Sequence, residues 1–174
     1  SKQVTKKSRN KILTVGSDGF RKGFGYAVDI SKSLTGYEYS WYGDITDQME
    51  QNSIKCQGLV DSVPFYKYNY YFLTSLEDPW PIAVLEALAS GLLIFGWEHL
   101  SIIQALKKEG LAISVQSFSQ SDFSEKFKQY KFTKIDQKKV RLFLLRYSTE
   151  NIYGNQLQKE IDGILSKKFH EKHS

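Results

Sequence analysis

Residues 70–95 read YYFLTSLEDPWPIAVLEALASGLLIF, and this stretch decides the fold. It opens with an aromatic run typical of a strand and then becomes polar over the segment LEDP. Pro81 suits the first turn of a helix, and Gly91 suits the position that closes one. The apolar run that follows fits a central strand covered on both faces. The stretch therefore predicts a strand, a helix and a second strand, the repeating unit of a parallel α/β sheet.

The same alternation extends outward in both directions along the chain. Apolar and aromatic patterns broken by glycine-containing turns predict the other elements. We expect strands at 11–16, 37–42, 53–57, 70–74, 92–95 and 111–115, and helices at 21–34, 63–68, 81–90, 101–108, 122–129, 136–146 and 150–167. This order predicts a Rossmann-like three-layer sandwich with a parallel sheet, whose ligands bind beyond the carboxyl ends of the strands.

Length and composition are those of one globular domain. The chain has 174 residues, of which 41% are hydrophobic and 25% charged. No apolar run approaches the roughly 20 residues of a membrane-spanning helix, and no signal segment opens the chain. The single cysteine, Cys56, excludes an internal disulfide and favours a reducing compartment. We therefore expect one soluble, cytoplasmic domain over residues 1–174.

Basic residues are unevenly placed in a chain of net charge +5. Two runs stand out: Lys6, Lys7, Arg9 and Lys11 at the start, and Lys138, Lys139 and Arg141 near the end. Such runs fit nucleic acid, an anionic membrane or plain solvated faces, of which the last is commonest. We expect no nucleic-acid partner, and we keep peripheral contact with the inner face of a membrane as an alternative. The histidines His99, His170 and His173 lack metal-ligand spacing, so we expect no metal.

Two acids frame the central helix. Asp78 stands in the loop before it, and Glu86 follows eight residues later on the helix itself. Because eight residues make just over two turns, Glu86 faces roughly the same side as the helix entrance. The first N–H groups of a helix have no partner within it and can meet ligand oxygens. Taken alone, Asp78 also fits a simple helix cap, and Glu86 an exposed or salt-bridged helix residue.

With its neighbours, this segment resembles the acidic motif of the retaining GT-B glycosyltransferases, and specifically the subgroup pattern SxEDPFP…LEAxAxG. The matching residues are Ser75, Glu77, Asp78, Pro79, Pro81, Leu85, Glu86, Ala87, Ala89 and Gly91. Trp80 replaces the usual Phe, and Asp78 replaces the commoner Glu, which shortens its reach by one methylene. The resemblance implies that Asp78 and Glu86 are the catalytic pair, with Glu86 on the ribose hydroxyls of a nucleotide-sugar donor.

The resemblance extends to three further groups of donor-binding residues. The backbone after Asp78, at Trp80, Pro81 and Ile82, is implied to face the donor sugar. The segment VGSDGFRKGF at 15–24 resembles the glycine turn and Lys-Gly pair of the family. By that likeness Lys22 binds the diphosphate and Arg21 assists it, while Gly16 and Ser17 allow the backbone to approach the ligand. Leu59 and Val60, after the strand at 53–57, match the family's nucleobase contacts. The simpler alternatives are solvated basic residues and an ordinary strand-end turn.

These observations predict the C-terminal, donor-binding lobe of a glycosyltransferase. The parent enzyme is expected to move a sugar from a nucleoside-diphosphate donor to a hydroxyl acceptor with retention and without a metal or other cofactor. The acceptor lobe, in cis or as a partner subunit, is absent from these residues, so the lobe alone should be inactive. A non-catalytic nucleotide- or sugar-binding module and a basic domain that docks on nucleic acid or anionic lipid are the two alternatives. The missing Walker and GxGxxG motifs argue against ATPase and dehydrogenase functions.

Overall fold

The computed structural model describes residues 10–17, 19–44, 53–78, 81–131 and 133–150 together with Gly163. Within them, six strands form one parallel sheet in the order β3-β2-β1-β4-β5-β6. The strands are β1 (Lys11–Val15), β2 (Glu38–Tyr42), β3 (Lys55–Gly58), β4 (Tyr70–Leu73), β5 (Leu93–Trp97) and β6 (Ala112–Val115). The chain runs outward from β1 to β3 and then restarts beside β1 at β4. The parallel α/β sheet itself is the one that the sequence pattern predicts.

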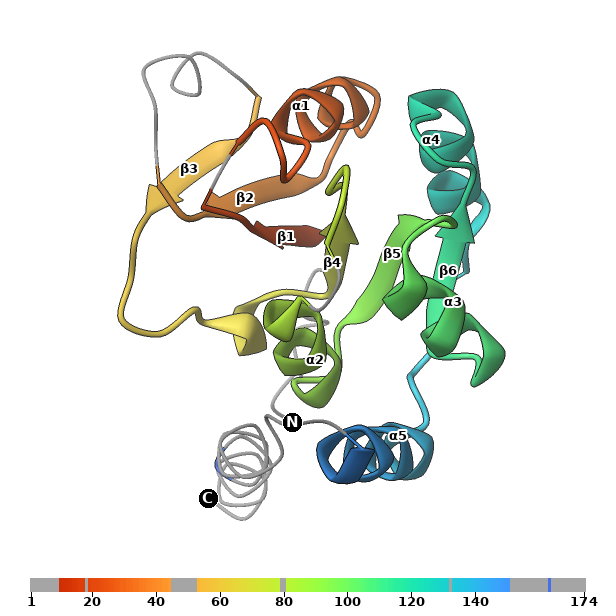
Figure 1. The fold of residues 1–174 in the computed structure, drawn as a ribbon. Helices are drawn as coiled ribbons and strands as arrows, with labels where there is room; N and C mark the ends of the chain where they lie inside the picture. Colours follow the sequence, from red (N-terminus) through yellow and green to blue (C-terminus); the bar gives the residue numbers. More distant parts are fainter. Residues whose placement is uncertain are drawn as a thin grey trace, which may run out of the picture.

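Helices cover both faces of the sheet (Figure 1). They are α1 (Phe24–Lys32), the single-turn 3-10 helix η2 (Phe65–Lys67), α2 (Ile82–Ala89), α3 (Ser101–Lys108), α4 (Gln120–Gln129) and α5 (Gln137–Glu150). Helices α1 and α4 contact each other on one face, whereas α2 and α5 contact each other on the opposite face (Figure 1). The arrangement is the three-layer sandwich expected from the sequence.

Most element boundaries differ from the predictions by no more than two residues, and two helix ends differ by three or four. We expected the first helix to begin at Arg21, but α1 begins at Phe24, because Gly23 adopts a left-handed conformation with φ of 72°. We expected a helix to end at Arg146, but α5 continues to Glu150. The basic residues Lys6, Lys7 and Arg9 lie outside the described residues, as does nearly all of the helix predicted at 150–167.

Aromatic rings fill the core on the face covered by α4. Phe72 of β4 lies 4.7 Å from Phe123 and 4.9 Å from Phe127, measured between ring centroids. Phe95 of β5 lies 5.1 Å from Phe127 in the same cluster. Edge-to-face pairs at these distances stabilise a core beyond the burial of their area. Of the aromatic residues at 65–72, the buried ones are Phe65, Tyr70, Tyr71 and Phe72, whereas Tyr66 is 63% exposed.

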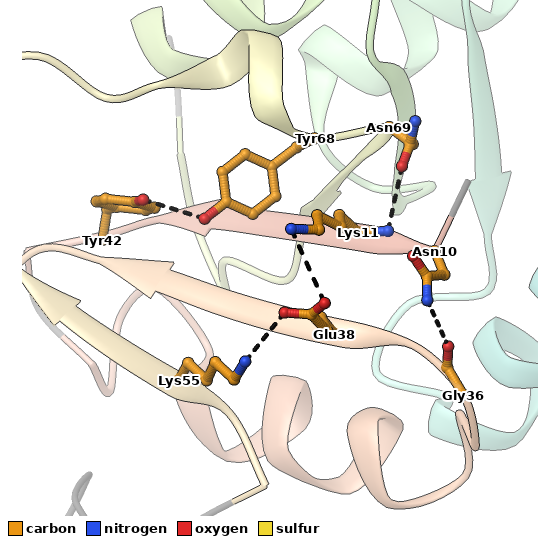
Figure 2. A network of polar contacts seen from close by, with 8 residues as sticks. All are labelled: Asn10, Lys11, Gly36, Glu38, Tyr42, Lys55, Tyr68 and Asn69. Atoms are coloured by element: carbon orange, nitrogen blue, oxygen red, sulfur yellow. Dashed lines mark hydrogen bonds and ion pairs between the residues drawn. The ribbon is translucent and has the colours of Figure 1, made fainter. Parts of the chain in front are cut away.

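Ion pairs join the amino ends of the strands β1, β2 and β3 (Figure 2). Glu38, the first residue of β2, pairs with Lys55 at 3.0 Å and with Lys11 at 3.8 Å, and these lysines are the first residues of the two neighbouring strands. These cations hold the pKa of Glu38 below its usual range, chiefly through the hydrogen bond from Lys55. Lys11, which we grouped with the basic N-terminal run, is thus part of the sheet rather than a free charge.

Candidate functional site

The candidate site lies where the strand order reverses. Strands β1 and β4 are neighbours in the middle of the sheet, although they are separated by two strands in sequence. In such sheets the loops after the two central strands diverge to opposite faces and leave room for a ligand at the carboxyl edge. The loop after β1 carries Lys22, and the loop after β4 carries Asp78. Two of the residues singled out in the sequence therefore flank this position.

These two loops are bonded to each other directly. Lys22 Nζ forms an ion pair and hydrogen bond with Asp78 Oδ2. Two further bonds reinforce the contact: Thr74 Oγ1 donates to the Lys22 carbonyl at 3.0 Å, and the Leu76 N–H donates to the Arg21 carbonyl at 2.8 Å. The side chains of Lys22 and Asp78 are only 27% and 8% exposed. The ammonium is thus held at the centre of the carboxyl edge and is only partly exposed to solvent.

Glycines make this close approach possible. A Cβ at Gly16 would lie 2.7 Å from Cβ of Lys22 and 2.8 Å from the ring of Trp41. At Gly23, the φ of 72° favours glycine, and a Cβ would lie 1.9 Å from the carbonyl oxygen of Thr74. Both positions require the absence of a side chain, so the glycines of the segment VGSDGFRKGF serve to seat Lys22 against β4.

Two carboxylates approach the same buried region from different elements. Asp78 also accepts a hydrogen bond from Ser75 Oγ at 3.4 Å. Glu86 is half-buried on α2. The pKa of the Tyr71 hydroxyl on β4 is raised, mostly by burial, and the charges of both Asp78 and Glu86 add to that rise. Both acids therefore lie within electrostatic reach of one tyrosine oxygen, on the side of β4 that α2 covers.

The carboxyl ends of the outer strands continue this edge. Trp41 Nε1 donates to the Gly16 carbonyl at 3.0 Å, and the Gly43 N–H donates to the Gly58 carbonyl at 3.0 Å. A Cβ at Gly43 would lie 1.9 Å from the Gly16 carbonyl oxygen. This chain of contacts brings the loop after β3 to the same edge as Lys22. Leu59 and Val60 follow Gly58 directly and are 74% and 44% exposed.

The other predicted residues divide by exposure. Ser17 and Arg21 are exposed, as is Ile82 at 48%, so these three are accessible to a ligand. Pro81 is buried and precedes the first residue of α2, whereas we expected it within the first helical turn. Trp80 lies outside the described residues.

His99 is a further residue of this edge, and the sequence pattern assigned it no role beyond the absence of metal-ligand spacing. It follows β5, and its Nε2 lies 2.8 Å from the Leu76 carbonyl, while its Nδ1 lies 2.5 Å from Ser117 Oγ. The ring thereby connects the loop after β4 to the loop after β6. Its ring also lies 4.9 Å from that of Phe118, between centroids. No motif could reveal this role, because it depends on which loops the sheet order brings together.

Two observations concern cofactor and membrane binding. Within the described part of the chain, no three His, Cys, Asp or Glu residues gather where a metal ion could be held. The helices that the structure describes include none with the length and apolar character needed to cross a bilayer.

Comparison with known proteins places this geometry in a structural class. The sequence matches no family model, and it matches no curated protein. Solved structures do match the fold. A glycosyltransferase from Rickettsia africae has a TM-score of 0.66 at 15% identity over 94% of this chain and 47% of its own. WaaG, a glycosyltransferase of lipopolysaccharide biosynthesis, has a TM-score of 0.63 at 15% identity, over 90% of this chain and 47% of its own.

A third similar structure, HepE from Anabaena in complex with UDP and glucose, has a TM-score of 0.61 at 10% identity. It is matched over 97% of this chain and 50% of its own. At these identities the likeness is one of fold, and the fold is that of a Rossmann-like GT-B lobe. The chain spans about half the length of each of these structures.

Proposed function

We propose that this GT-B lobe binds the nucleoside-diphosphate sugar of a retaining glycosyltransferase that transfers a sugar to a hydroxyl acceptor. One observation carries the proposal: Lys22 and Asp78 form a shielded ion pair at the position where β1 and β4 diverge. A ligand-binding lysine is expected there because the carboxyl edge at a strand-order reversal is where open α/β sheets bind ligands. Proteins of similar fold were solved with UDP and glucose, or with UDP-2-fluoro glucose, which supports this ligand class.

The diphosphate is assigned to Lys22. An ammonium has three N–H donors, so Lys22 can keep its bond to Asp78 while it donates to phosphate oxygens. When the sugar departs, negative charge grows on the diphosphate, and a cation already fixed beside it stabilises that charge without reorganising. Arg21 is exposed next to it and supplies a second cation, while Gly16 and Ser17 form the backbone turn below the phosphates.

The remaining contacts are assigned from the positions of the other loops. Glu86 accepts hydrogen bonds from the two vicinal ribose hydroxyls, which suits a carboxylate with several acceptor sites. The exposed Leu59 and Val60 lie beside the nucleobase. Asp78, Pro81 and Ile82, the first residue of α2, border the sugar, and we assign Trp80 to the same sugar from the motif alone. In this proposal Asp78 has a second role, because its carboxylate also holds Lys22 in place.

The acceptor side belongs to a second lobe. The chain covers about half of the glycosyltransferase structures it resembles, and we propose that a further lobe, in cis or as a partner subunit, completes the enzyme. The lobe alone should then bind nucleotide without transferring sugar. We also propose that the assembly works in the cytoplasm, with peripheral contact at the membrane through basic surfaces such as Lys138 and Arg141, which are exposed on α5.

Titration calorimetry with UDP, GDP and ADP tests the ligand class. We expect the wild-type chain to bind at least one of these nucleotides, and we expect Glu86→Ala to weaken that binding by about tenfold or more, since hydrogen bonds to a charged group contribute about 1.5–3 kcal/mol. Glu125→Ala is a matched control, because Glu125 is an exposed helical glutamate on α4, and it should leave the affinity unchanged. Equal affinities of wild type and Glu86→Ala would argue against the ribose assignment.

A further inference from the structure

Tyr71 carries a polar group whose position the fold alone does not explain. It is fully buried on β4, with 0% relative exposure, and its hydroxyl has no hydrogen-bond partner among the described residues. A buried hydroxyl that loses water and gains no partner destabilises the folded state. Phe72 and Phe95 show that this sheet accommodates phenylalanine in equally buried positions. The oxygen of Tyr71 is thus a cost to the fold that calls for an explanation.

The surroundings of the hydroxyl point to the donor site. Phe72 packs on α4, and because side chains alternate along a strand, Tyr71 points to the opposite face, which α2 covers. Burial raises the pKa of Tyr71, as do the charges of Asp78 and Glu86, so the phenol stays protonated and remains a donor. The backbone of Val15 lowers the pKa of Tyr71, but its geometry relative to the Tyr71 hydroxyl falls short of a hydrogen bond.

The two carboxylates differ as acceptors for this hydroxyl. Asp78 is held by Lys22 and Ser75, both in the loops at the switch point. Glu86 projects from α2, the helix that covers the face to which Tyr71 points. A carboxylate offers about four acceptor sites, so it can accept from a phenol and from two ribose hydroxyls together.

We propose that Tyr71 is a positioning residue of the donor site, whose hydroxyl donates a hydrogen bond to the Glu86 carboxylate when a ribose binds there. The inference rests on the proposed function and deepens it. Among the described residues the hydroxyl has no partner, and the Glu86 carboxylate becomes its acceptor when nucleotide binds. The new hydrogen bond offsets the burial of the hydroxyl and favours one orientation of Glu86.

Tyr71→Phe tests this, because it removes one oxygen and keeps the shape of the core. We expect the melting temperature to be equal to or above that of wild type and the affinity for UDP, or for whichever nucleotide the chain binds, to fall about fivefold or more. Inorganic pyrophosphate engages Lys22 but not Glu86, so its affinity should not change. In the Glu86→Ala background, Tyr71→Phe should cause no further loss.

Tyr39→Phe is the matched control. Tyr39 is a buried tyrosine of β2 whose hydroxyl lies 2.8 Å from Thr14 Oγ1, so this variant should lower the melting temperature and leave nucleotide affinity unchanged. If Tyr71→Phe binds nucleotide as wild type does while Glu86→Ala binds weakly, the inference is wrong and the proposed function stands. A lower melting temperature for Tyr71→Phe would also overturn it, and a wild-type chain that binds no nucleotide would overturn both.

Discussion

Lys22 combines two roles at the scale of a single residue. It neutralises Asp78, which is 8% exposed, and it presents a cation at the carboxyl edge of the sheet. A carboxylate with so little contact with water needs a partner, because an unpaired buried charge strongly destabilises a protein. The ion pair therefore couples the stability of the fold to the placement of the charge that we propose binds phosphate.

Lys22→Met separates these roles when combined with Asp78→Asn. The single variant leaves a buried carboxylate unpaired and should lose about 1–3 kcal/mol of unfolding free energy, together with about tenfold or more in nucleotide affinity. Adding Asp78→Asn removes the stranded charge, so stability should recover while binding stays weak. Lys32→Met should change neither property, since Lys32 is 65% exposed and its ion pair with Asp29 lies on the surface of α1. Urea titration and calorimetry give the two quantities, and wild-type affinity in Lys22→Met would refute the diphosphate assignment.

At this scale the sequence identified which residues belong to the candidate site, but it did not show which of them contact each other. The motifs singled out Lys22, Asp78 and Glu86 by their spacing in the sequence from neighbouring glycines and prolines. The bond between Lys22 and Asp78 joins residues 56 positions apart, and local patterns carry no information on such contacts. Tyr71 lies on the strand predicted at 70–74, but the fact that its hydroxyl has no partner among the described residues depends on how several elements meet around it.

At the scale of elements, His99 acts as a clamp between two loops. The Nε2 nitrogen donates to the Leu76 carbonyl, and Ser117 Oγ, which accepts from the His99 N–H at 3.2 Å, donates its own hydrogen to Nδ1. This assignment satisfies each group once with a neutral ring. The loop after β4, which leads to Asp78, is thereby fixed from the side of β6 as well as from the side of β1.

His99→Ala should loosen that loop without unfolding the sheet. Hydrogen exchange at the amide of Leu76, which is bonded to the Arg21 carbonyl, is expected to accelerate about threefold to tenfold, because each hydrogen bond contributes about 0.5–1.5 kcal/mol. His99→Gln keeps one donor for the Leu76 carbonyl and should give a smaller effect. The amide of Phe72, in the middle of the sheet, serves as the internal reference. Unchanged exchange at Leu76 in His99→Ala would show that the histidine does not hold the loop.

Element boundaries followed from the sequence where turn chemistry is explicit. The predicted helix at 101–108 coincides with α3. Gly91, which follows the C-cap residue Ser90 of α2, has φ of 84°, as a closing glycine should. The first helix was placed three residues too early, because Arg21 and Lys22 are compatible with a helical turn. The left-handed conformation of Gly23 and its packing on Thr74 prevent that turn, and only the tertiary contact reveals it.

At the scale of the whole molecule, sheet order determines where the site lies. The alternation of strands and helices predicted a parallel sheet, but not that β4 returns beside β1. That return places the loop with Lys22 against the loop with Asp78. Residues that are far apart in the sequence, from Gly16 to Ser117, therefore lie along the same edge of the sheet. Similar folds occur in glycosyltransferases about twice as long, which is why we assign to this lobe the binding of the donor and not the complete transfer.

A crystal structure of the chain with bound UDP, or with whichever nucleotide calorimetry selects, tests the central claim most directly. The account predicts that one nucleotide spans the switch point between β1 and β4, with its diphosphate at Lys22 Nζ and its ribose hydroxyls at the Glu86 carboxylate. A nucleotide bound on another surface, or one whose ribose lies away from Glu86 while its phosphates contact Lys22, would contradict it.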